Sequence, residues 1–156
     1  MTGTRVTGNA GESMSIDTNL VEYVIVSMPQ VGDLSLLAPP LGRLVQDRTL
    51  RVLDLVAVET TLEGSVQVIE PEYIPGLAAL AGSVGIGDGI LSERDLLLAS
   101  TVVRPGSAAI IVVVEDLWAR RLSNAAKRAG GNVIAGERIP QSRLEAALAR
   151  VSPGKD

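Results

Sequence analysis

The chain has no cysteine and no histidine among its 156 residues. This absence excludes disulfides, thiolate nucleophiles, imidazole bases and the usual protein ligands of zinc, copper and haem. Aromatic residues make up only 2% of the chain, so platforms that stack nucleic-acid bases lack material. Serine hydrolysis has no support either, because no histidine is present to activate a hydroxyl. We therefore expect no catalytic residue, no cofactor and no metal site, since any metal would have to be bound by oxygen atoms alone.

The balance of charge narrows the range of partners. Basic and acidic residues number 14 and 18, which gives a net charge of −4, and no run of Lys or Arg is longer than the pair Arg120 and Arg121. A negative net charge without a long basic run argues against nucleic acid or an anionic membrane as the primary partner. Residues 1–19 are polar and predict a flexible tail rather than a signal peptide or a membrane span. We expect a cytoplasmic protein with a single α/β domain over residues 20–152, because 46% of the residues are hydrophobic.

The spacing of apolar residues predicts an α+β fold. The apolar run at residues 108–114 follows Pro105 and Gly106 and is typical of a central strand that is buried on both faces. The first six expected elements follow the order β-α-β-β-α-β of a ferredoxin-like sandwich, which a C-terminal helix, strand and helix extend. The other strands are expected at residues 20–28, 51–59, 65–70 and 132–139, and the helices are expected to begin near Pro40, Ser92, Trp118 and Pro140.

A ferredoxin-like sandwich places its helices on one face of a mainly antiparallel sheet. The predicted strands carry too few polar residues to leave the other face in water. We therefore expect that face to be covered by a second copy of the chain in a homo-oligomer, or by the C-terminal helix. The sequence does not indicate the stoichiometry of such an oligomer.

Trp118 is the only tryptophan of the chain and stands at the start of a predicted helix. Leu122 and several alanines follow it at helical spacing, with arginines on the opposite side. We interpret Trp118 as the largest core anchor of that helix rather than as a ligand platform. Its replacement by Ala would then cost about 3–5 kcal/mol of stability.

Three carboxylates are candidate ligand-binding residues. Glu115 and Asp116 stand where the central strand ends and the next helix begins, a place where α/β proteins often bind ligands. In the functional interpretation, the two carboxylates bind a cation or act as acid and base. In the structural interpretation, Asp116 caps the helix and Glu115 complements the helix dipole. Because adjacent strand residues point to opposite faces, they do not form a catalytic pair on their own. Asp54 interrupts an apolar strand. It is either buried there, where it would need a partner, or it lies at an edge of the sheet and faces water or pairs with a surface Arg.

Residues 82–89 read GSVGIGDG and pose the question of a phosphate-binding loop. The glycine spacing does not match a dinucleotide loop, and no basic residue stands within the segment. Asp88 also places a negative charge where a phosphate would lie. We interpret the segment as a connection between two helices.

Four blocks of sequence carry a resemblance to known proteins. They read VEYVIVSMP at residues 21–29, RVLDLVAV at 51–58, RPGSAAIIVVVEDLWA at 104–119 and RAGGNVIAGERIP at 128–140. Through them the chain resembles a family of small bacterial α/β proteins known only as a domain of unknown function. That family is similar to a broader, glycine-rich group that includes proteins described as membrane-bound. The resemblance covers residues 20–150 and implies no catalytic residue, and the shorter glycine-rich segment here speaks against membrane association.

The leading functional hypothesis is a non-enzymatic, self-associating structural or regulatory module in the cytoplasm. One alternative is a small-ligand sensor that binds a metabolite at a subunit interface, by analogy with other ferredoxin-like domains. Another is a carboxylate-dependent enzyme, which would require Asp54, Glu59, Glu115 and Asp116 to converge in one pocket.

Overall fold

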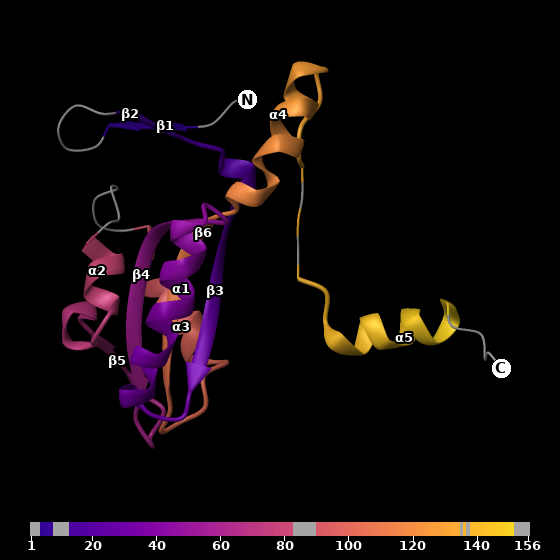
Figure 1. Cartoon of the computed structure of the whole chain (residues 1–156). Helices are drawn as coiled ribbons and strands as arrows, with labels where there is room; N and C mark the ends of the chain where they lie inside the picture. The colour runs from indigo at the N-terminus through magenta and orange to yellow at the C-terminus, as the bar shows by residue number, and fades with distance from the viewer. Residues whose placement is uncertain (1–3, 8–12, 83–89, 135, 137, 152–156) are drawn as a thin grey trace.

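The computed structural model describes residues 4–7, 13–82, 90–134, 136 and 138–151. Its centre is an antiparallel sheet of four strands in the order β3-β6-β4-β5 (Figure 1). The fold is α+β, as the sequence predicted. The strands of this sheet are β3 (Val21–Met28), β4 (Arg51–Thr60), β5 (Val66–Ile69) and β6 (Ala108–Glu115), and a separate pair consists of β1 (Thr4–Thr7) and β2 (Ser13–Ile16).

The order of the strands differs from the predicted ferredoxin-like topology. In a split βαβ unit of that kind the third strand lies between the first two. Here β6, the last strand of the sheet, lies between β3 and β4, and β5 takes an edge. Every residue of β6 is buried, which suits the centre, whereas β5 exposes Gln67 and Val68 to solvent and suits an edge. The described part of the expected last strand, residues 132–134, 136 and 138–139, forms no strand.

Helices cover both faces of the sheet, where the sequence predicted one. On one face, Ile110 and Val112 of β6 pack in a core with α1 and α2. On the other face, Ile111 packs with Ala99 of α3 and with Val103, which follows this helix; α3 lies behind the sheet in Figure 1. The face that was expected to need a second copy is therefore covered by α3. The helices are α1 (Ala38–Gln46), α2 (Leu77–Gly82), α3 (Glu93–Ser100), α4 (Arg120–Arg128) and α5 (Gln141–Val151), with short 3-10 turns that include η3 (Val31–Leu37) and η5 (Leu117–Ala119).

Two local signals in the sequence act at the ends of elements. Ser92, near which a helix was predicted to begin, forms a capping box with Asp95 at the start of α3: the Asp95 Oδ2 accepts the Ser92 N–H at 2.8 Å, and Ser92 Oγ accepts the Asp95 N–H at 3.3 Å. The hairpin between β4 and β5 turns at Gly64, whose φ of 91° favours glycine. Such signals depend on neighbours in the chain, so the sequence alone is sufficient to find them.

The two ends of the described chain behave differently. Ile16, in the predicted tail, is buried and packs with Leu53 and Val113 of the sheet. Helix α5 lies apart from the sheet in Figure 1 and contains no buried residue, so it does not cover either face.

The proposed boundary at residue 20 stays a prediction, and residues 83–89 of the glycine-rich segment lie outside the described residues. Within the described part of the chain, no helix has the length and apolar character needed to cross a membrane.

Candidate functional site

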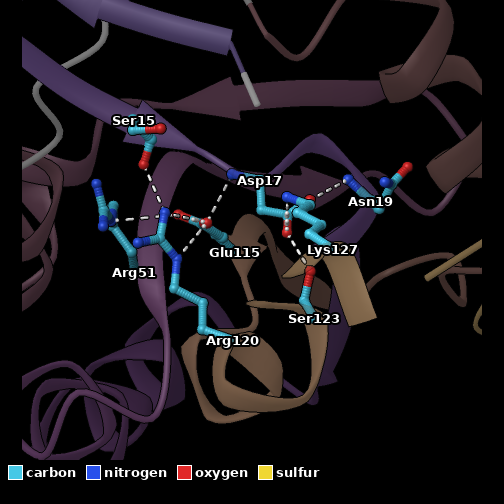
Figure 2. Close-up of polar contacts among 8 residues, drawn as sticks. All are labelled: Ser15, Asp17, Asn19, Arg51, Glu115, Arg120, Ser123 and Lys127. Atoms are coloured by element: carbon cyan, nitrogen blue, oxygen red, sulfur yellow. Dashed lines mark hydrogen bonds and ion pairs between the residues drawn. The ribbon is translucent and has the colours of Figure 1, made fainter. Parts of the chain in front are cut away.

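Glu115 is completely buried at the end of β6, where it forms the centre of an ion-pair network (Figure 2). Its Oε2 accepts hydrogen bonds from Arg120 Nε at 3.1 Å, from Arg120 Nη2 at 3.0 Å and from the Asp17 N–H at 2.8 Å. Arg51 Nε lies 3.4 Å from Glu115 Oε1. Two guanidinium groups therefore compensate a charge that water cannot reach, which is the arrangement of a structural ion pair rather than of a reactive carboxylate.

Asp17 extends this network to α4. Its Oδ2 accepts hydrogen bonds from Ser123 Oγ at 2.5 Å and Lys127 Nζ at 2.8 Å, and its Oδ1 accepts the Asn19 N–H at 3.1 Å. Burial alone would raise the pKa of Asp17, but hydrogen bonds from Lys127, Ser123 and Asn19 outweigh burial and lower it. No pattern in the sequence indicates this role of Asp17, because Ser123 and Lys127 lie 106 and 110 residues further along the chain.

Asp54 fixes the connection into α3. A bulge in β4 lies between Val52 and Asp54, so Asp54 is opposite Val113 and on the α3 side of the sheet. Its Oδ1 accepts the Leu55 N–H at 2.8 Å and its Oδ2 accepts the Leu91 N–H at 2.9 Å. Asp54 is half-buried, and its carboxylate is used by backbone groups rather than facing water at an edge.

Asp116 is half-buried beside Glu22 of β3, and the two carboxyl groups form what we call the carboxyl pair. The pKa of Asp116 is raised to about 7, first because burial penalises the charged form and then because Glu22 shares a hydrogen bond with it and repels its charge. Trp118 and Arg138 act in the opposite direction. Asp116 occupies the predicted N-cap position, but its side chain makes no capping bond to η5. Its carboxyl group instead shares hydrogen bonds with Glu22 and with Trp118.

An apolar groove of about 330 Å³ lies next to the carboxyl pair, between β3, β6 and α1. We call it the β3–α1 groove. Its sheet side includes the half-buried Val24 and Val26, and its helix side includes Leu41 and Leu44, of which Leu44 is 40% exposed. The charged groups that line it are the carboxyl pair and Arg138. Glu22 is opposite Val114 and Val26 is opposite Ile110, so the carboxyl pair stands at one end of the groove.

Trp118 is not the core anchor that helical spacing predicted, because 69% of its surface is exposed. Leu122 is equally exposed, whereas Ala119 and Ser123 are the buried residues of this segment. The physical reason is that α4 is attached through Ser123 and Lys127 to the N-terminal segment, which turns its apolar stripe outward. The large loss of stability expected for the removal of a core tryptophan therefore does not apply.

The exposed Trp118 lines a second pocket of about 410 Å³, which we call the Trp118 pocket. Leu122 and the carboxyl pair also line it, so the carboxyl pair stands between this pocket and the β3–α1 groove. A pocket with a carboxyl of raised pKa is a candidate binding site. Sequence analysis identified Asp116 but missed Glu22, whose approach depends on the pairing of β3 with β6.

The raised pKa of Asp116 predicts how stability changes with pH. Between pH 3.8 and about 7 the unfolded state has lost this proton and the folded state retains it, so the free energy of unfolding should fall as pH rises. The slope should be less than about 1.4 kcal/mol per pH unit, because solvent screens a half-buried group. The lowered pKa of Asp17 acts in a separate window, since its stabilisation is lost only as pH falls below 3.8.

Urea unfolding of the Asp116→Asn variant at a series of pH values measures this effect. The substitution should flatten the dependence across that window, whereas Glu63→Gln, in the exposed hairpin turn, should leave it unchanged. An identical pH dependence in the unaltered chain and in Asp116→Asn would show that Asp116 does not retain its proton.

Comparison with known proteins assigns the chain to a family without assigning an activity. No curated protein and no solved structure matches the chain. Among the described residues, no group of three or more acidic side chains is placed to hold a metal ion. A family model described as a family of unknown function matches residues 20–152, in agreement with the resemblance seen in the sequence blocks. The chain therefore belongs to the family of unknown function DUF6325.

Proposed function

We propose that this protein is a non-enzymatic binding module whose β3–α1 groove takes an apolar helix of a protein partner. The observation that carries the proposal is the groove itself, which has apolar walls and a carboxyl pair at one end. Apolar helices bind to proteins by laying one face into a groove of this kind. Half-buried side chains such as Val24 and Val26 would lose their remaining contact with water on binding, which favours association.

The positions of the candidate carboxylates support binding rather than catalysis. Asp54 is bonded to backbone N–H groups near α3, and Glu115 is enclosed by arginines. Glu59 pairs with Ala108 at the opposite end of β6 from Glu115. Of the four candidates, Asp116 is the one that lines the groove, so the convergence required by the enzyme hypothesis is not found.

A neutral apolar dye, N-phenyl-1-naphthylamine, tests the groove through its increase in fluorescence on binding. The titration uses the Leu148→Glu chain, because the exposed apolar side chains of α5 would otherwise compete with the dye. Adding Leu44→Glu places a charge in the groove and should weaken dye binding by about tenfold or more, since the dye would then cover a charged side chain in place of an apolar one.

The matched control adds Leu97→Glu instead, which changes an exposed leucine on α3, outside the groove lining. This control should leave dye binding unchanged. Equal dye binding with and without Leu44→Glu would show that the groove is not an apolar binding site.

A small organic cation is a second candidate ligand, because Trp118 lines its pocket together with the carboxyl pair. An exposed indole and a carboxylate are the groups that attract a positively charged ammonium. Such a ligand would change the fluorescence of Trp118 and would not respond to Leu44→Glu, since Leu44 does not line the Trp118 pocket. The two candidates are therefore separable with the same variants.

A bacterial origin, a cytoplasmic location, a regulatory role and kinship with the glycine-rich group stay predictions from the sequence.

A further inference from the structure

Helix α5 carries an apolar stripe that is exposed along its whole length. Leu144, Ala147, Leu148 and Val151 follow one another at i, i+3, i+4 and i+7 and so share one side of the helix. Leu148 is 54% exposed, and no residue of the helix is buried. A helix of 11 residues is marginal in water without packing against another surface. The stripe therefore indicates that α5 has a partner surface outside its position in this chain.

The β3–α1 groove has the dimensions and chemistry to be that surface. At 1.5 Å per residue α5 is about 16 Å long, and the stretch of β3 that lines the groove, from Glu22 to Val26, spans about 17 Å at 3.4 Å per residue. The apolar stripe of α5 matches the apolar walls of the groove, where Val24 lies on the β3 side and Leu44 lies on the α1 side. Arg150 flanks the stripe one turn beyond Ala147, so α5 also brings a positive charge to a groove with a carboxyl pair at its end.

The connection to α5 favours the groove of a second copy over the groove of the same chain. Arg138 lines its own groove, and α5 begins at Gln141, three residues later. Ile139 precedes a proline, which restricts Ile139 to extended conformations, and the ring of Pro140 fixes its own φ. Placing α5 against its own groove would require the chain to reverse between Arg138 and Gln141, and the structure shows no such reversal there (Figure 1). Figure 1 shows α5 directed away from the sheet.

We propose that two copies of this chain exchange their α5 helices, each seated in the β3–α1 groove of the other. The exchange rests on the proposed binding function of the groove and names its partner. It makes a symmetric dimer in which each subunit gives one helix and receives one, a known low-cost route to a dimer. The sequence predicted self-association through an open sheet face, whereas here it occurs through α5 and the groove.

Native mass spectrometry of the full chain tests the exchange. The unaltered chain should be a dimer, and the single substitutions Leu148→Glu on α5 and Leu44→Glu in the groove should each abolish it. The matched control Leu97→Glu should remain dimeric, because this exposed leucine lies on α3. Circular dichroism of each variant confirms that a lost dimer does not reflect a lost fold.

Mixing the two defective variants provides a sharper test. The Leu148→Glu chain retains its groove and the Leu44→Glu chain retains its α5, so together they can form one intact contact. We expect a heterodimer to appear on mixing, although each variant is monomeric alone. A mixture that stays monomeric would overturn the exchange.

The remaining outcomes separate the inference from the proposed function. An unaltered chain that is monomeric rejects the exchange. If Leu44→Glu still weakens dye binding in the Leu148→Glu chain, the groove keeps its proposed binding function and has another partner. A dimer that survives both single substitutions uses a different surface and also rejects the exchange. Loss of both the dimer and the groove-dependent dye signal would reject the inference and the proposed function together.

Discussion

Replacing Arg120 with Met is expected to lower the free energy of unfolding by about 3–5 kcal/mol, the usual cost of leaving a buried charge without its partner. Glu115 has no exposed surface, and its Oε2 would lose both hydrogen bonds from the guanidinium. Its Oε1 accepts no hydrogen bond among the described residues, and Arg51 Nε lies 3.4 Å from it. The remaining Asp17 N–H and Arg51 do not compensate the charge fully. Urea unfolding at neutral pH measures the loss.

The neighbouring residue provides the control for this prediction. Arg121 is exposed, and its replacement by Met should change stability by no more than about 0.5 kcal/mol. Adding Glu115→Gln to Arg120→Met removes the stranded charge and should recover part of the lost stability. Equal stabilities of the Arg120→Met and Arg121→Met variants would show that the network contributes nothing to folding.

Replacing Ile111 with Ala is expected to cost about 2–5 kcal/mol, through lost burial and the cavity that remains. Ile111 has no exposed surface and lies in the middle of β6, where it packs with Ala99 of α3 and with Val103, which follows this helix. The smaller change Ile111→Val should cost about 0.5–1.5 kcal/mol, because it removes only one methylene group. Thermal and urea unfolding of the full chain measure both.

Ile111 lies on the face of the sheet for which the sequence predicted no covering helix among the first six elements. Val102, which is 68% exposed just after α3, provides the control, and Val102→Ala should have little effect. If Ile111→Ala were as mild as Val102→Ala, α3 would not seal that face and self-association through it would again be the better explanation.

The sequence by itself determined the elements whose cause is local. The run at residues 108–114 is a strand because its apolar, β-branched residues suit a position buried on both faces, and it is the central strand β6. Ser92 and Asp95 begin α3 because their side chains bond to backbone groups within one turn. The resemblance carried by four sequence blocks also agreed with the family that the chain belongs to.

The sequence predicted only one of the two residues of the carboxyl pair. Asp116 stood out by its place after the central strand, but Glu22 was only a polar residue near the start of the strand expected at residues 20–28. The two meet because β3 pairs with β6 in a register that sets Glu22 opposite Val114. Trp118 showed the correct helical spacing, yet spacing identifies an apolar side of a helix and does not say whether that side faces the core or the solvent.

Tertiary structure alone decided the order of the strands, the covering of both sheet faces and the partners of the buried acids. The order of the strands depends on how completely each strand is buried relative to the others. The pattern of one segment does not contain this comparison. Glu115 and Asp17 are 98 residues apart and become neighbours only when the N-terminal segment crosses the end of β6. Local patterns record which residues avoid water, whereas the partner that compensates a buried charge is fixed by contacts between distant parts of the chain.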